Sequence, residues 1–196
     1  MISKLAKSIA HFFVVQNITE ESKEVIYAYG MELLISDVLN TIIVLLFALF
    51  SHTLPAVVVF IAVFMGLRQF VGGFHANSHL SCMFTLVMVM MVFSYGICNV
   101  SGHITPIFSI SFIMIALPII LCIAPVPHPN KPMSEEKSVK LRKRSCILAV
   151  TLSVVTIALL VFQYQKLSLY VSSGMLLSAI MALLGHFLNR GDNSKR

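Results

Sequence analysis

The sequence predicts an all-α, polytopic integral membrane protein with about six transmembrane helices and an N-terminal amphipathic helix. Of its 196 residues, 58% are hydrophobic and only 11% are charged, and the mean hydropathy is +0.91. A soluble domain carries roughly a quarter of charged residues. The apolar residues also form long uninterrupted blocks, which favour helices over the short alternating strands of a membrane β-barrel. We expect a single membrane domain over residues 1–196.

Residues 1–18 predict an amphipathic helix that lies in the membrane interface. One helical face is apolar and the opposite face carries Lys4, Lys7 and His11. The stretch lacks the continuous apolar core and small-residue cleavage site of a secretory signal peptide. The alternative is an ordinary first helix that packs on the bundle.

The helical bundle is expected over residues 19–188, and residues 189–196 are expected to form a polar tail. Thr19 is predicted to cap the first long helix, which then runs to Phe50. The predicted spans are 19–50, 54–70, 82–99, 104–124, 146–162 and 167–188.

The basic residues predict the orientation of the spans. If the N-terminus is cytoplasmic, thirteen of the 14 lysines and arginines fall on the inner side and Lys166 alone falls outside. This distribution is a strong positive-inside bias. We therefore expect a multi-pass protein of the cell membrane with both termini cytoplasmic. The net charge of +6 is explained by lipid contact, without a nucleic-acid partner.

The stretch RQFVGGFHANSHLSC, residues 68–82, concentrates polar and reactive groups between two apolar blocks. A thiol becomes a nucleophile beside a base, so His75 and Cys82 are a candidate catalytic pair. In one unbroken helix they would be about 10.5 Å apart along the axis, too far for a hydrogen bond. The pairing therefore predicts a broken backbone between them. Gly72 and Gly73 supply conformational freedom for a break, and Asn77 and Ser78 favour turns.

Other readings of the same stretch stay open. The cysteine could be an apolar filler, the glycine pair could serve helix packing, and Arg68 could be an interfacial anchor. His75 and His79 have the spacing of two zinc ligands on a helix, although the glutamate of a zinc protease motif is missing. Arg68, His75 and His79 could also line the path of a small transporter or channel.

A family resemblance rests on three segments. Arg68, Gly72, Gly73, His75 and Cys82, with this spacing, resemble the signature of the AgrB family of membrane peptidases. The stretch APVPHPNKP, residues 124–132, resembles a second recurring motif of that family. The stretch YGMELLISDVLN, residues 29–40, resembles its first membrane helix.

The resemblance implies a cysteine endopeptidase without a cofactor or a catalytic metal. Its implied partner is a precursor peptide of the AgrD type, which it cleaves in quorum sensing. Cys82 would be the nucleophile and His75 its base, while Arg68 and Gly73 match positions that the family needs for activity. The cleaved precursor would then close into a thiolactone, or into a lactone from a serine. The charge distribution places this site at the cytoplasmic face.

Further polar residues are candidates for supporting roles. One hypothesis is that Glu32 orients His75 or holds a basic part of the precursor, because ionisable groups within spans are often functional. The alternative is that Glu32 lies in the headgroup zone of the membrane. Asn130 and Lys131 are candidates to face the site and bind precursor carboxylates; the alternative is that their proline-rich segment only ends the fourth span. The basic run of residues 137–144 is predicted to be a loop at the lipid surface that could also attract an acidic precursor tail.

Small residues recur at every fourth position of the last span, at Gly174, Ser178 and Ala182. Such a face lets two helices approach closely. We expect packing within the chain, with a homodimer seam as the alternative.

Overall fold

The computed structural model describes residues 2–72, 87–89, 91–92, 95–97, 99–100, 103–126 and 135–193. Within this part of the chain, five helices are long and apolar enough to cross a membrane. They confirm the prediction of an all-helical, polytopic membrane protein. The predicted span at 82–99 lies largely outside the described residues, and its described parts at 87–89, 91–92 and 95–97 are helical.

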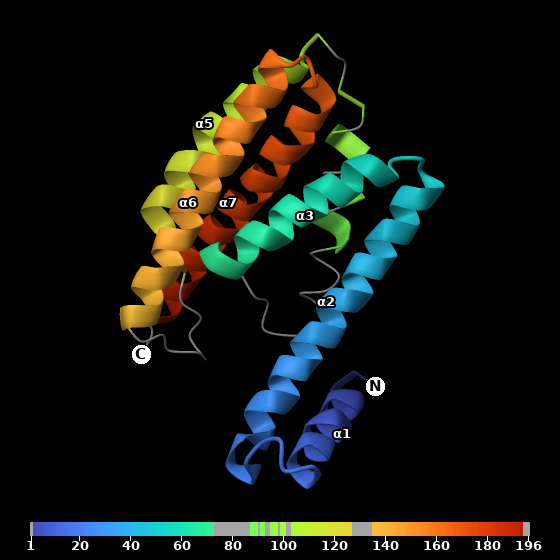
Figure 1. Cartoon of the computed structure of the whole chain (residues 1–196), viewed down its shortest axis with the longest axis vertical. Helices are drawn as coiled ribbons and strands as arrows, with labels where there is room; N and C mark the ends of the chain where they lie inside the picture. The colour runs from blue at the N-terminus through green and yellow to red at the C-terminus, as the bar shows by residue number, and fades with distance from the viewer. Residues whose placement is uncertain are drawn as a thin grey trace. The chain divides into compact units, whose positions relative to one another are not determined.

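The chain forms two compact units. The first contains the two N-terminal helices, and the second contains the other four long helices (Figure 1). The elements are α1 (Ile2–Val15), the 3₁₀ turn η1 (Glu21–Lys23), α2 (Glu24–Phe50), α3 (Leu54–Val71), α5 (Thr105–Ile123), α6 (Glu135–Val161) and α7 (Gln165–Asn193).

In the first unit, α1 packs on α2 through a narrow strip of small residues. Ala6 and Ala10 are fully buried, and Phe13 meets the ring of Tyr27 edge to face at 6.4 Å. Leu5 and Phe12, on the flank of the strip, are more than half exposed. Helix α1 therefore packs on α2, and the interfacial location of residues 1–18 stays a prediction.

The predicted cap at Thr19 is wrong. The 3₁₀ turn begins after Glu20, whose side chain makes no capping hydrogen bond. The chain leaves α1 through Asn17, which has a φ of 56° and lets the amide of Ile18 donate to the carbonyl of Phe13 at 2.9 Å. The amide of Thr19 also points back to Phe13, at 3.4 Å, so Thr19 belongs to the end of α1.

In the second unit, α7 is the central helix, packed by α3, α5 and α6. Inside this unit 72% of the apolar part of α7 is buried, against 22% for α5 and for α6. Serines make this burial compatible with helix packing, because each hydroxyl can bond to a carbonyl of its own helix. Ser172 bonds in this way to Leu169, and Ser168 also meets Ser109 of α5 at 3.1 Å.

The small-residue face of α7 packs against α3. A Cβ atom added at Gly174 would lie 2.9 Å from the carbonyl oxygen of Phe60 and 3.0 Å from the Cβ of Val63. Ser178 and Ala182 on the same face are also buried. The expectation of packing within the chain is confirmed for this face.

We expect Gly174→Ala to lower the thermal unfolding temperature of the purified protein, because α3 and α7 would have to move apart. Overpacking of this kind costs about 1–3 kcal/mol. The matched control is Gly30→Ala in α2, where an added Cβ meets nothing within 4 Å. Equal unfolding temperatures for the two variants would contradict the close approach of α3 and α7.

The predicted loop before the fifth span is wrong. The basic run was expected to be a loop, but it forms the first turns of α6, which begins at Glu135. Acidic residues in the first turn and the ion pair of Glu136 with Lys140, one turn apart, favour this helix. The apolar part of α7 ends at Phe187, which agrees with the predicted span 167–188, and the helix itself continues to Asn193.

Candidate functional site

The candidate site begins where α3 ends. The helix stops at Val71. Gly72 adopts φ 76° and ψ −158°, a conformation that residues other than glycine rarely adopt. The amide of Gly72 still donates to the carbonyl of Arg68, at 3.0 Å. The predicted break between His75 and Cys82 lies outside the described residues; the structure shows that α3 ends at the first glycine of the pair, before His75.

A backbone junction joins the end of α3 to the segment after α5. The amide of Val126 donates to the carbonyl of Val71 at 2.9 Å, and Gly72 and Val126 form a parallel bridge. A Cβ atom at Gly72 would lie 2.6 Å from the carbonyl oxygen of Val126. Because real Cβ contacts are never this short, the junction requires glycine for space as well as for its dihedral angles.

The segment after α5 leaves the helix in the way its prolines predict. Ala124 is extended, with φ −71° and ψ 144°, and the Ala124–Pro125 peptide bond is cis. An extended residue before proline is the expected conformation, because the proline ring disfavours a helical residue in front of it. The extended exit frees Val126 from the helix and allows it to pair with α3.

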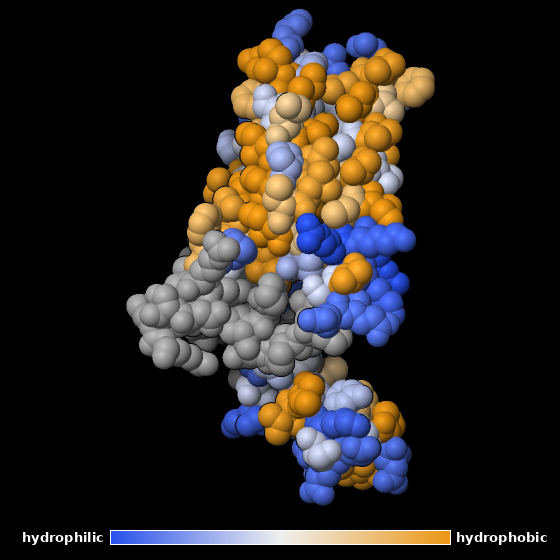
Figure 2. Space-filling view, turned by 90° about the vertical axis from the view of Figure 1, so that its left-hand side faces the viewer, coloured by the Kyte–Doolittle hydropathy of each residue, from blue (hydrophilic) through white to orange (hydrophobic). Residues whose placement is uncertain are grey.

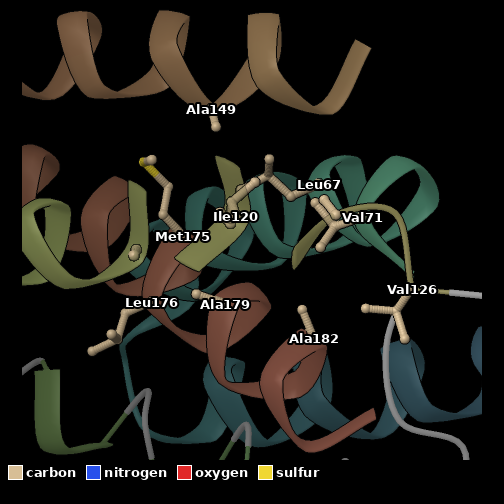
Figure 3. Close-up of a cluster of buried hydrophobic side chains, with 11 residues drawn as sticks. Leu67, Val71, Ile120, Val126, Ala149, Met175, Leu176, Ala179 and Ala182 are labelled. Carbon is tan, nitrogen blue, oxygen red and sulfur yellow. The ribbon is translucent and has the colours of Figure 1, made fainter. Parts of the chain in front are cut away.

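A hydrophobic cluster anchors the junction (Figure 3). Val71 and Val126 belong to the same buried cluster as Ile120 of α5, Ala149 of α6 and Ala182 of α7. All four helices of the second unit therefore hold the two segments in place. The two segments that carry the sequence motifs thus continue from one fixed point, at residues 73 and 127.

Arg68 lies one turn before the junction. Its guanidinium carbon is 5.6 Å from the centre of the ring of Phe64, and that ring is fully buried. A cation over a shielded aromatic ring gains roughly 0.5–2 kcal/mol. The position fits a fixed positive charge at the edge of the core better than a freely moving surface anchor.

Of the predicted site residues, the structure brings Arg68 and Gly72 together at the end of α3. Glu32 lies in α2 of the first unit, half-buried, and its backbone carbonyl accepts a 2.7 Å hydrogen bond from Ser36. The remaining predicted residues lie outside the described part of the chain; they are Gly73, His75, His79, Cys82, Asn130 and Lys131.

Two other cysteines lie at this end of the second unit. Cys122 is exposed in the last turn of α5, and Cys146 is half-buried in α6; both are free thiols. Neither has a histidine beside it in sequence. They provide built-in controls for any experiment on Cys82.

Sequence reasoning missed Val126. It is an apolar residue between two prolines, and this pattern does not indicate which part of the chain its backbone would pair with. Its role arises from a backbone hydrogen bond to a distant residue, which no residue type encodes. The one available signal was Gly72, because a glycine at a helix end is compatible with a close backbone approach.

Comparison with known proteins supports the sequence motifs. A family model described as AgrB, accessory gene regulator B, matches residues 3–182. An AgrB-like protein of Clostridium beijerinckii is 25% identical over 145 residues, which cover 72% of this chain and 71% of the relative. No solved structure matches the chain. The match covers both segments of the junction, the N-terminal helix, and all or most of each of the five described spans. Because the family model covers most of the chain, this chain belongs to the AgrB family.

Proposed function

We propose that the protein is a membrane cysteine endopeptidase that cleaves an AgrD-type precursor peptide and helps close it into a cyclic signal for quorum sensing. The observation that carries the proposal is the family match over residues 3–182, which implies this role. Cys82 is the proposed nucleophile and His75 the proposed base. No metal or cofactor is needed for this chemistry.

The junction of Gly72 and Val126 supports the grouping of the motif residues into one site. Covalent geometry keeps His75, three residues beyond Gly72, within about 11 Å of it. The same argument keeps Asn130, four residues beyond Val126, within about 14 Å. Side chains from both motifs can therefore reach a shared site, in which Asn130 and Lys131 bind precursor carboxylates.

The proposed reaction proceeds in two balanced steps. His75 takes the proton of the Cys82 thiol, and the sulfur attacks the carbonyl carbon of the scissile bond. The carbon–nitrogen bond breaks, the leaving amine takes the proton from His75, and a thioester joins the precursor to Cys82. An internal cysteine thiolate of the precursor then attacks the thioester carbonyl. The bond to Cys82 breaks and a thiolactone is released, with no net oxidation or reduction.

The second step exchanges one thioester for another, so it requires no external energy source. Water competes with the internal thiol for the same carbonyl carbon, and its exclusion favours ring closure. The buried cluster that contains Val71 and Val126 supports a site shielded from water, because both motif segments continue from it.

The charges of the second unit support a site at the cytoplasmic face. Arg68 lies at the end of α3, beside the buried cluster in which α3 and α6 meet. The basic turns of α6 come just before the residue that α6 contributes to this cluster. Lys166 lies at the start of α7. A hydrogen bond between Ser168 and Ser109 joins this part of α7 to the start of α5, at the opposite end of α5 from the junction. Basic residues therefore gather at the end that carries the junction, which under the positive-inside rule faces the cytoplasm.

Glu32 is proposed as a supporting residue that orients His75 or holds a basic part of the precursor. Its half-buried position in α2 is compatible with a polar group near the membrane boundary. The role requires Glu32→Gln to slow single-turnover cleavage.

A trapping experiment tests the proposed function. Wild-type protein in lipid vesicles is mixed with a tagged AgrD-type precursor whose ring-forming cysteine is replaced by alanine. Because ring closure is blocked, we expect an acyl-enzyme that hydroxylamine cleaves and that mass spectrometry maps to Cys82. The unaltered precursor should yield the cyclic product and little adduct.

Two outcomes would contradict the proposal. Cleavage without a covalent adduct, inhibited by a metal chelator, would indicate a metal-dependent hydrolase. Uptake of the intact precursor into the vesicles without cleavage would indicate a transporter.

A further inference from the structure

The first turns of α6 carry an unusual concentration of exposed charge. Five bases lie within residues 137–144, and all five side chains are exposed. The helix has 27 residues, or about 40 Å at 1.5 Å per residue. The hydrocarbon core of a bilayer is about 30 Å thick. The basic turns therefore project beyond the hydrocarbon on one side of the membrane.

The side chains of α6 divide into a face toward the bundle and an outer face. Ser145, Ala149, Ser153 and Thr156 are buried, and at about 100° per residue they fall within about 40° of Ala149. This arc is the bundle face.

The basic residues are unequally distributed between these faces. Measured from Ala149, four bases point about 120–180° away, on the outer face. They are Lys137, Lys140, Lys143 and Arg144. Arg142, by contrast, points within about 20° of Ala149, on the bundle face. One carboxylate, Glu136, also lies on the outer face and pairs with Lys140.

Along the outer face of α6, the basic residues are followed by exposed apolar side chains. Ile147, Val154 and Val155 share its direction and are 56%, 60% and 41% exposed. In Figure 2 the side of the second unit formed by α5 and α6 is largely hydrophobic, with hydrophilic residues gathered next to it. The outer bases therefore stand at the level of lipid headgroups, directly beyond a lipid-facing stripe.

We propose that the outer face of the first turns of α6 binds the headgroups of anionic phospholipids. The flexible stems of lysine and arginine can extend along the apolar stripe and present their charges to phosphate oxygens. This binding is independent of the proposed peptidase chemistry, because none of the four residues belongs to the proposed site. Of the two partners considered for this basic run, the proposal selects the lipid rather than an acidic precursor tail.

The test compares two arginines on opposite faces of the same helix. Full-length Arg144→Gln and Arg142→Gln are placed in nanodiscs of phosphatidylcholine with spin-labelled phosphatidylglycerol or phosphatidylcholine. Electron paramagnetic resonance then gives the association of each label with the protein. We expect Arg144→Gln to lower the preference for phosphatidylglycerol roughly fivefold, and Arg142→Gln to change it less than twofold. The double variant Lys143→Gln/Arg144→Gln should lower it roughly 25-fold, and salt should weaken the wild-type preference.

Equal effects of Arg142→Gln and Arg144→Gln would overturn the proposal, because they would show dependence on net charge alone. An unchanged lipid preference in the double variant would also overturn it. A third result would overturn the proposal in favour of an acidic peptide as the partner. In that case a soluble poly-glutamate peptide would bind the wild type in neutral nanodiscs, and the double variant would lose this binding while keeping its lipid preference. Unfolding temperatures in neutral nanodiscs should be unchanged, since the substituted side chains are exposed.

Discussion

Replacing Cys82 by alanine is expected to abolish both precursor cleavage and the covalent adduct. The nucleophile supplies the bond-forming sulfur, and loss of such a group lowers kcat by roughly 10³-fold or more. His75→Ala should lower cleavage to a similar extent, because the two residues would act as one unit. The measurement is single-turnover cleavage of a tagged AgrD-type precursor by purified protein in lipid vesicles.

The two described thiols, Cys122 and Cys146, separate this result from general thiol loss. Cys122→Ala and Cys146→Ala remove free thiols from the last turn of α5 and from α6, and both variants should keep wild-type cleavage. Precursor binding by Cys82→Ala should also persist, since the side chain changes little in size. Cleavage that survives in Cys82→Ala would rule out the proposed mechanism.

Replacing Gly72 by alanine is expected to reduce cleavage by about 100-fold without unfolding the bundle. The new Cβ would lie 2.6 Å from the carbonyl oxygen of Val126, and the φ of 76° would itself be strained. Backbone strain of this kind costs about 1–3 kcal/mol, which the junction can relieve by opening. Because motif residues from both sides of the junction are proposed to share one site, a displacement of about 1 Å can reduce the rate about 100-fold.

Gly66→Ala is the matched control for Gly72→Ala. It lies in the same helix, where an added Cβ meets nothing within 4 Å, and it should leave cleavage unchanged. Thermal unfolding and gel filtration of both variants show whether the fold persists. Wild-type cleavage by a folded Gly72→Ala protein would show that the junction does not position the site. Cys82 reactivity toward a small thiol reagent would distinguish a displaced site from a lost precursor contact.

Most of the helices could be predicted from sequence because lipid imposes a simple rule. A spanning segment must satisfy its backbone internally, and a block of apolar residues leaves helix as the available solution. The span expected at residues 54–70 accordingly matches α3, Leu54–Val71. The prediction failed where this rule does not apply. The basic turns of α6 are polar, yet lysine, arginine and glutamate are good helix formers, so the helix continues beyond the apolar block.

The candidate site could be predicted in part. Chemistry singled out Cys82 and His75, and the rise of a helix required an interruption between them. That stretch lies outside the described residues, but the structure shows that α3 ends at Gly72, and it shows a partner for this helix end that the sequence did not indicate. Hydrogen bonding between Val126 and Val71 joins segments that are far apart along the chain, and their residue types carry no record of it.

Hydropathy, charge and side-chain chemistry are local properties, and they were sufficient to predict the membrane class, the helical architecture and the family motifs. They also indicate the cysteine and the histidine expected to react. Packing in three dimensions was needed to show that α7 is the buried centre of the second unit and that Gly174 serves packing within the chain. It also decided that the two motif segments start from one backbone junction. Such features depend on which surfaces meet, and a close approach between backbones is decided by packing rather than by the identity of either residue.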